Sequence, residues 1–338
     1  MASLALGLGG CAQLRYVTQA SAGQAELLDR QLPIDELVRG GHLAPRTRAL
    51  LARVGAIKAF GERRGLRATS SYTHYVNLER PAVVWVVSAC DPLAFRSKVW
   101  SFPVTGSITY LGWFREGEAQ TFAAELRGEG WDVDLRGASA YSTLGWFNDP
   151  VLSTMLVPGE AGLGELADVI LHESLHATYF IKSQSALNES LASFVGNRLA
   201  GVYLDEALGH DSPEKRAYVA LEQRAAARGA EMRAAYERLE AVYASPVTPA
   251  VKLREKARVL SALRDRSREG GVNNATLIQY QTYGAGEPEL ARLFASCAGD
   301  WARFLRVLDR ARPAFGAAPP HAEPAELLAP LVRAGCPR

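Results

Sequence analysis

The chain has 338 residues, of which 48% are hydrophobic and 22% charged, a balance typical of a globular protein with a sizeable core. Its formal net charge of +2 is too small to indicate nucleic acid or an anionic membrane surface as the main partner. Beyond the first residues, no apolar stretch of the sequence reaches the roughly 18 residues that a membrane-spanning helix needs.

The first residues resemble a bacterial lipoprotein signal. A short run rich in Leu and Gly, MASLALGLGG, leads directly to Cys11. In such a lipobox a signal peptidase cuts before the cysteine, which then carries the lipid. We therefore expect a signal-like segment at residues 1–10 and an exported protein anchored by lipid in the cell envelope, at the periplasm or outer membrane. No Lys or Arg precedes the run, and a frayed apolar tail is the alternative.

Three further cysteines remain if Cys11 is lipidated, namely Cys90, Cys297 and Cys336. An odd number cannot all pair within one chain, and the spacings match no zinc-ribbon pattern. We assign these cysteines no chemistry.

Helical periodicity opens the chain, and strand-like segments follow. Residues 20–66 carry apolar residues at three- and four-residue spacing. The continuous β-branched and aromatic run at 82–89 predicts a buried strand. Residues 106–114 and 131–147 are also strand-like, and 116–130 between them predicts a helix closed by glycine.

The second half is predicted to be helical, beginning with helices over 163–181 and 186–204. The charged stretch 213–269 indicates two long helices that form a solvated hairpin. A further helix is expected around 287–312. The Pro/Ala-rich residues 318–326 are typical of a linker before a short tail.

The stretch DVILHESLHATYF, residues 168–180, carries the most specific chemical signal. His172 and His176 are four residues apart, so on a helix they share one face and can hold one zinc ion. Glu173 points elsewhere on the helix, where it can reach a metal-bound water without being a ligand. The flanking residues are apolar nearly all round, and buried His and Glu side chains need partners. The pattern favours a metal site over two surface histidines.

A catalytic zinc needs a third protein ligand, and Glu189 is the candidate. It opens the next predicted helix after the short polar turn KSQS. Ala192, Ser193 and Gly196 lie on the same face as Glu189, and their small side chains would let the two helices approach closely. The alternative is an ordinary first-turn glutamate favoured by the helix dipole.

These motifs resemble the gluzincin arrangement of zinc peptidases, in which H-E-x-x-H is followed by N-E-x-x-A. Here NESLASFVG is similar to the glutamate-bearing helix of thermolysin-like enzymes. Only 12 residues separate His176 from Glu189, fewer than in thermolysin. Ser193 also stands where those enzymes carry an aspartate that orients a zinc histidine.

Most of the chain resembles a bacterial family of predicted lipoprotein aminopeptidases. The resemblance covers the lipobox, the zinc helices and the blocks SYTHYVNLERPAVVWVVSA, WSFPVTGSITYLGWF, AYSTLGWFNDPVLSTML and NNATLIQYQTYG. It implies a zincin-like catalytic domain with Zn²⁺ as cofactor and a peptide as substrate.

Two further parts of a peptidase cleft have candidates. A strand just before the metal helix would edge the cleft and pair with an extended substrate, although a plain core strand is the alternative. The candidate residues of this edge are Tyr141, Ser142, Thr143, Leu144 and Gly145. For the oxyanion donor the candidate is Tyr283, with Tyr280 beside it as the competing choice, and a tyrosine packed against a helix is the alternative.

The predicted fold class is α+β and mainly helical, a zincin-like core with a small antiparallel sheet and a charged helical hairpin. We expect one catalytic domain over residues 11–338, with the hairpin inserted at about 205–270. The predicted function is a zinc-dependent peptidase, an aminopeptidase, in which Glu173 is the general base. Two alternatives stay open: an inactive envelope scaffold or binding protein on the same fold, and a metal-dependent hydrolase of a non-peptide amide. The sequence does not decide between exo- and endopeptidase or give the oligomeric state.

Overall fold

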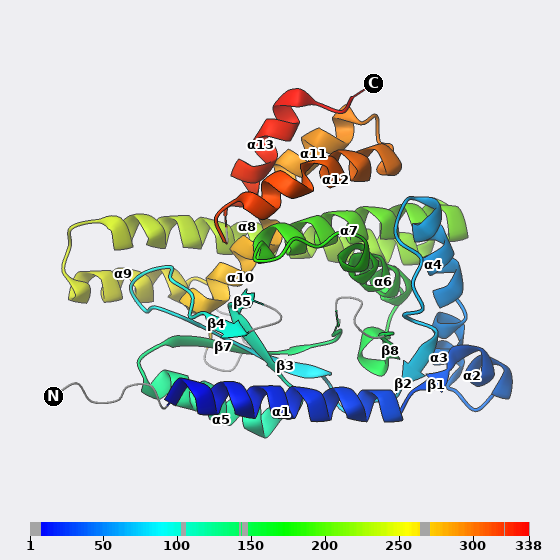
Figure 1. The fold of residues 1–338 in the computed structure, drawn as a ribbon, viewed down its shortest axis with the longest axis horizontal. Helices are drawn as coiled ribbons and strands as arrows, with labels where there is room; N and C mark the ends of the chain where they lie inside the picture. Colours follow the sequence, from blue (N-terminus) through cyan, green and yellow to red (C-terminus); the bar gives the residue numbers. More distant parts are fainter. Residues whose placement is uncertain are drawn as a thin grey trace. The chain divides into compact units, whose positions relative to one another are not determined.

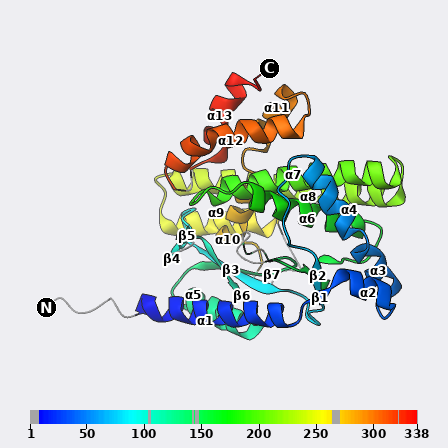
Figure 2. The same ribbon diagram turned by 45° about the vertical axis from the view of Figure 1, so that its right-hand side comes forward.

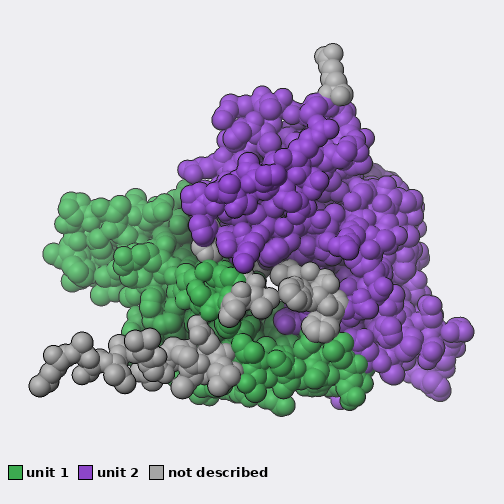
Figure 3. All heavy atoms as spheres, in the orientation of Figure 1, with its two compact units in different colours: residues 1–30, 80–139, 229–281 green, residues 31–79, 140–228, 282–338 purple. Residues whose placement is uncertain are grey.

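The computed structural model describes residues 8–102, 106–141, 143, 148–263, 271–320 and 322–337, without the side chains of residues 8–14 and 282–284. Two compact units make up the chain (Figure 3). Unit 1 consists of residues 1–30, 80–139 and 229–281, and unit 2 consists of residues 31–79, 140–228 and 282–338. The single catalytic domain over 11–338 stays a prediction.

Unit 1 is built on a three-stranded antiparallel sheet in the order β6-β3-β7. All seven residues of the central strand β3 (Val84–Cys90) are buried, as its β-branched run predicted. The outer strands are β6 (Tyr110–Trp113) and β7 (Asp132–Ala138). A separate two-stranded ribbon pairs β4 (Trp100–Phe102) with β5 (Gly106–Ile108).

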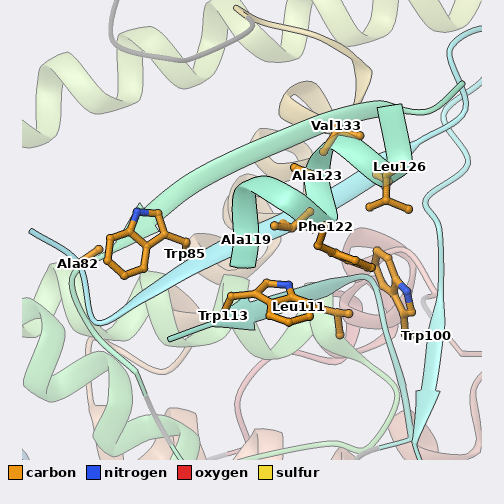
Figure 4. Packing of buried hydrophobic residues seen from close by; sticks show 12 residues of the cluster. Ala82, Trp85, Trp100, Leu111, Trp113, Ala119, Phe122, Ala123, Leu126 and Val133 are labelled. Carbon is orange, nitrogen blue, oxygen red and sulfur yellow. The ribbon is translucent and has the colours of Figure 1, made fainter. Parts of the chain in front are cut away.

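Two helices cover one face of this sheet, α1 (Leu8–Asp29) and α5 (Glu116–Gly128), and both views show them side by side (Figures 1 and 2). Large aromatic side chains fill the space between α5 and the strands (Figure 4). The ring centroids of Trp113 and Phe122 lie 5.1 Å apart, and the Tyr16 ring of α1 packs edge-on against Trp113 at 5.9 Å. Trp85 and Trp113 of this core come from segments predicted to be strands, whereas Phe122 comes from the helix predicted between them.

The charged helices predicted within 213–269 are α8 (Pro213–Ala244) and α9 (Pro249–Ser261). The end of α8 packs on α9 and on α10 (Asn274–Gly284) through an apolar cluster that includes Leu239, Tyr243 and Leu277. Within unit 1, which holds residues 229–244 of α8 and all of α9, one face of the helices is therefore buried in this cluster.

Unit 2 begins with short elements: β1 (Leu32–Pro33), α2 (Ile34–Gly40), α3 (Pro45–Leu51) and α4 (Val54–Arg63). Strand β2 (His74–Val76) pairs antiparallel with β1 and parallel with β8 (Val151–Leu152), and a 3₁₀ turn at Ser153–Met155 follows β8. The strand predicted over 131–147 ends at Ala138. Tyr141 and Thr143, which the prediction included, lie outside any strand.

The long helices α6 (Gly162–Thr178) and α7 (Ser185–Leu208) form the centre of unit 2. The C-terminal part adds α11 (Glu287–Ser296), α12 (Trp301–Ala317) and α13 (Pro324–Ala334). The linker and tail predicted from residue 318 are wrong in part: Pro324 opens a helix, a position where proline is favoured, and a disulfide between Cys297 and Cys336 ties the end of the chain to α11. None of the helices that the structure describes is both long and apolar enough to cross a membrane.

Candidate metal centre

The turn between α6 and α7 fixes the direction of the second helix. The buried side chain of Asn188 closes the turn, since its Oδ1 accepts the Ile181 N–H at 2.9 Å and its Nδ2 donates to the Ile181 carbonyl at 2.8 Å. Gln184 Nε2 in the same turn donates to the Pro319 carbonyl at 2.9 Å. The residue after Asn188 is therefore held in a defined orientation at the start of α7.

The three predicted metal ligands come together across these helices. Glu189 Oε2 lies 3.6 Å from His172 Nε2, and Glu189 Oε1 lies 3.8 Å from His176 Nε2. One ligand atom from each residue can be chosen so that all three lie within 4.8 Å of one another. Tetrahedral zinc with bonds of about 2.1 Å places its ligands about 3.4 Å apart, so the two His–Glu separations need only small adjustment. Two nitrogens and one oxygen are a donor set that suits zinc.

Small residues let α7 approach α6 this closely. Ala192 and Gly196 are buried at the contact. A Cβ on Gly196 would lie 2.5 Å from Asp168 Oδ1 and 3.0 Å from His172 Cβ, distances that real Cβ atoms avoid. The small face predicted on the second helix is therefore the face that meets the histidine helix.

Two polar atoms next to the ligands are buried without a hydrogen-bond partner in the described part of the chain. They are Glu173 Oε2 and His176 Nδ1. A buried carboxylate oxygen without a donor is costly unless something else occupies the site. Such an oxygen beside three ligand atoms fits a base that would accept a hydrogen bond from a water on a bound metal ion.

The charges around the cluster favour a cation. Burial lowers the pKa of His172, but the facing carboxylate of Glu189 and the negative charges of Glu173 and Asp168 outweigh it and raise that pKa to about 9. Burial dominates at His176 and lowers its pKa. The carboxylates therefore favour positive charge at His172, the position where a metal ion would supply it.

A polar network that the sequence did not predict lies behind His172. Asp168 is one turn earlier on α6, and its Oδ2 accepts a hydrogen bond from the Tyr218 hydroxyl at 3.1 Å. Burial raises the pKa of Asp168 to about 6. Glu222 accepts a hydrogen bond from Asn197, and burial together with neighbouring acidic side chains raises its pKa to about 7. The only signal for Asp168 in the sequence was its four-residue spacing from His172.

Tyr72, also missed, lies in the electrostatic reach of the candidate base. It belongs to the block SYTHYVN and is 5% exposed. Burial raises the pKa of Tyr72 well above its usual value, and the charges of Glu173 and Asp149 raise it further. Its φ of 62° is in the left-handed region, which non-glycine residues rarely adopt and which often marks functional sites.

Of the predicted substrate edge, Tyr141 and Thr143 are described, whereas Ser142, Leu144 and Gly145 lie outside the described residues. Thr143 is not part of a strand but is held by Asp149, to which both its N–H and its hydroxyl donate. The backbone pairing expected of a cleft edge stays a prediction.

The tyrosine candidates fall on α10, where the side chain of Tyr283 lies outside the described residues. Tyr280 packs against the apolar cluster of α8 and α9. Other residues of the block NNATLIQ attach α10 to β7: Asn273 Nδ2 donates to the Val133 carbonyl at 2.9 Å, and the Thr276 hydroxyl donates to Asp134 at 2.9 Å. These residues of the block therefore stabilise the packing of α10 on β7 within unit 1.

The remaining candidates, His210 and Cys11, are not part of the cluster. His210, the nearest other histidine in sequence, is exposed and lies 3.2 Å from Asp205 Oδ1. Cys11 belongs to helix α1, and the structure describes its backbone but not its side chain.

Comparison with known proteins gives one family. The family described as "Putative aminopeptidase" matches residues 15–314, which include both helices of the cluster. No curated protein and no solved structure matches the chain significantly.

Proposed function

The chain belongs to this aminopeptidase family, and on that premise we propose that it is a zinc-dependent peptidase that removes N-terminal residues from peptides. The observation that carries the proposal is the meeting of His172, His176 and Glu189 within 4.8 Å beside the unpartnered Oε2 of Glu173. Family membership supports peptide hydrolysis, and the donor set supports zinc.

When bound, zinc would polarise the scissile carbonyl and lower the pKa of a coordinated water to about 7. His172, His176 and Glu189 would hold the ion and leave one position open. Glu173 takes the proton from the attacking water and returns it to the leaving amine. Because Glu173 is not a ligand, its role is separable from metal affinity.

We extend the proposal to the fold and the compartment. The helix pair with its two histidines and one glutamate is the central feature of a zincin-like core, which supports that assignment for unit 2. The disulfide between Cys297 and Cys336 suits an oxidising compartment and supports export, with Cys11 as the lipid anchor.

The test is metal analysis of the purified chain, followed by hydrolysis of matched peptides with free and blocked N-termini. An aminopeptidase should contain about one zinc per chain, lose activity with a chelator and cleave only the free peptides. Equal cleavage of both would indicate an endopeptidase. Zinc binding without peptide cleavage would favour an inactive scaffold or a hydrolase of another amide.

A further inference from the structure

Asp149 is a buried acid that lies outside the metal cluster, and both its carboxylate oxygens bind one residue. It is 5% exposed. Its Oδ2 accepts the Thr143 N–H at 3.0 Å, and its Oδ1 accepts the Thr143 hydroxyl at 2.7 Å. Since one carboxylate accepts from both the backbone and the side chain of Thr143, it fixes the position and the direction of that residue.

The backbone of Asp149 binds a second segment. Its N–H donates to Ser71 Oγ at 3.1 Å, and its carbonyl accepts the Tyr72 N–H at 2.6 Å. Tyr72 has a φ of 62°, a conformation that persists in a non-glycine residue only when its surroundings impose it. The short bond to Asp149 is one of the contacts that impose it.

Tyr72 connects this arrangement to the candidate base. Its side chain is buried, and the negative charges of Glu173 and Asp149 both act on its hydroxyl. Asp149 therefore joins Thr143, in the predicted substrate edge, to a residue in the field of Glu173.

We propose that Asp149 is a positioning residue, which holds Thr143 and the Ser71–Tyr72 turn in one fixed arrangement so that a bound peptide is presented to Glu173. The inference rests on the proposed function, because the position of Thr143 affects turnover only if a peptide lies along it. Asp149 itself has no contact with the reacting atoms in this proposal.

The test compares Thr143→Val, Asp149→Ala and the double variant with the parent, all as zinc-loaded full chains acting on trialanine. Thr143→Val removes the hydroxyl bond and Asp149→Ala removes both acceptor oxygens, while the backbone bonds of Asp149 to Ser71 and Tyr72 stay in place. We expect KM to rise at least fivefold in both single variants, kcat to change less than twofold, and zinc content to stay the same. The KM of the double variant should not exceed the higher of the two single-variant KM values, because both single changes remove the same hydroxyl contact.

Two controls separate positioning from general damage. Thr143→Ser keeps both donors and should recover most of the lost affinity. Thr121→Val on the exposed face of α5 removes a hydroxyl bonded only within its own helix, to Gly117 at 2.8 Å, and should leave KM unchanged. KM values for Thr143→Val or Asp149→Ala within twofold of the parent, or effects of the two changes that multiply, would overturn the inference.

A parent that cleaves no peptide would refute the proposed function instead, and amide hydrogen exchange then decides the role of Asp149. Exchange at the Thr143 amide should be at least tenfold faster in Asp149→Ala than in the parent, because no side-chain oxygen is left to accept its N–H. Equal exchange would show that Asp149 does not hold this segment.

Discussion

Gly196 on α7 lies so close to Asp168 on α6 that a Cβ in its place would be 2.5 Å from Asp168 Oδ1. The same Cβ would be 3.0 Å from His172 Cβ. The separation of the two helices, and with it the distance from Glu189 to the histidines, thus depends on the absence of a side chain at position 196.

Gly196→Ala should push the helices apart and weaken zinc binding. Overpacking of this kind costs about 1–3 kcal/mol, so both the Tm and the zinc affinity should fall. Gly201→Ala on the same helix is the matched control, because its Cβ would meet only the flexible end of Lys215 at 3.1 Å. Thermal unfolding and competition with a weak chelator measure the two effects. Equal zinc affinity in both variants would show that the helix separation does not depend on Gly196.

The metal cluster could be predicted from the sequence because its geometry is local. A four-residue spacing puts His172 and His176 on one helix face, and a turn of a few residues brings Glu189 to them. Local spacing and turn length therefore suffice to bring these three side chains together.

The rest of the site depends on contacts between distant segments, which periodicity does not report. Asp149 meets Ser71, 78 residues earlier in the chain, and nothing in either segment signals the other. The strand expected up to residue 147 was too long for a related reason. The β-type composition of the sequence continues past Ala138. At Thr143, however, the chain is held by hydrogen bonds to the Asp149 side chain and not by pairing with a strand.

Glu222→Gln should stabilise the protein at high pH and not at low pH. Burial, followed by the charges of Asp168, Glu165 and Glu287, raises the pKa of Glu222 from 4.5 to about 7. As pH rises from about 4.5 to 7, the unfolded chain loses this proton first, so the folded state loses stability over that window. Gln carries no proton to lose and can still accept from Asn197.

We expect the Tm of Glu222→Gln to exceed that of the parent by a few degrees at pH 8 and to equal it at pH 4. Glu237→Gln, an exposed position on the same helix, is the control and should differ little at either pH. A Tm difference that is the same at both pH values would contradict the assignment of a raised pKa to Glu222.

Glu173→Gln should keep the metal and lose turnover. The amide has the shape of the acid but cannot take a proton, and general-base catalysis contributes about 10²–10⁴-fold. Zinc content by metal analysis and kcat on a free peptide are the two measurements. Activity equal to that of the parent would show that another group is the base.

Cys11→Ser should abolish lipid attachment and release the protein from the membrane fraction. Lipid attachment requires the nucleophilic thiol of Cys11, and Ser nearly keeps its size without that thiol. Fractionation of cells and the mass of the mature chain check the result. Unchanged membrane association, or a mature chain that retains Met1, would count against a lipoprotein.

The assignment of Glu189 as the third ligand can be tested against a matched control. The same helix pair carries another glutamate, Glu165, outside the proposed metal site. Glu189→Ala should weaken zinc binding by several kcal/mol, since both a carboxylate bond and its charge are lost. Glu165→Ala, in the first turn of α6, should retain zinc. Glu165 is also partly buried, and burial raises its pKa. The Glu165→Ala variant therefore measures the general effect of removing a half-buried carboxylate from these helices.

His210 supplies the competing outcome. It is exposed and lies beside Asp205, so His210→Ala should keep full zinc occupancy after dialysis against a weak chelator. Full occupancy in Glu189→Ala together with loss in His210→Ala would transfer the third ligand to His210. The gluzincin arrangement would then be wrong for this chain, because its glutamate would have no bond to the metal.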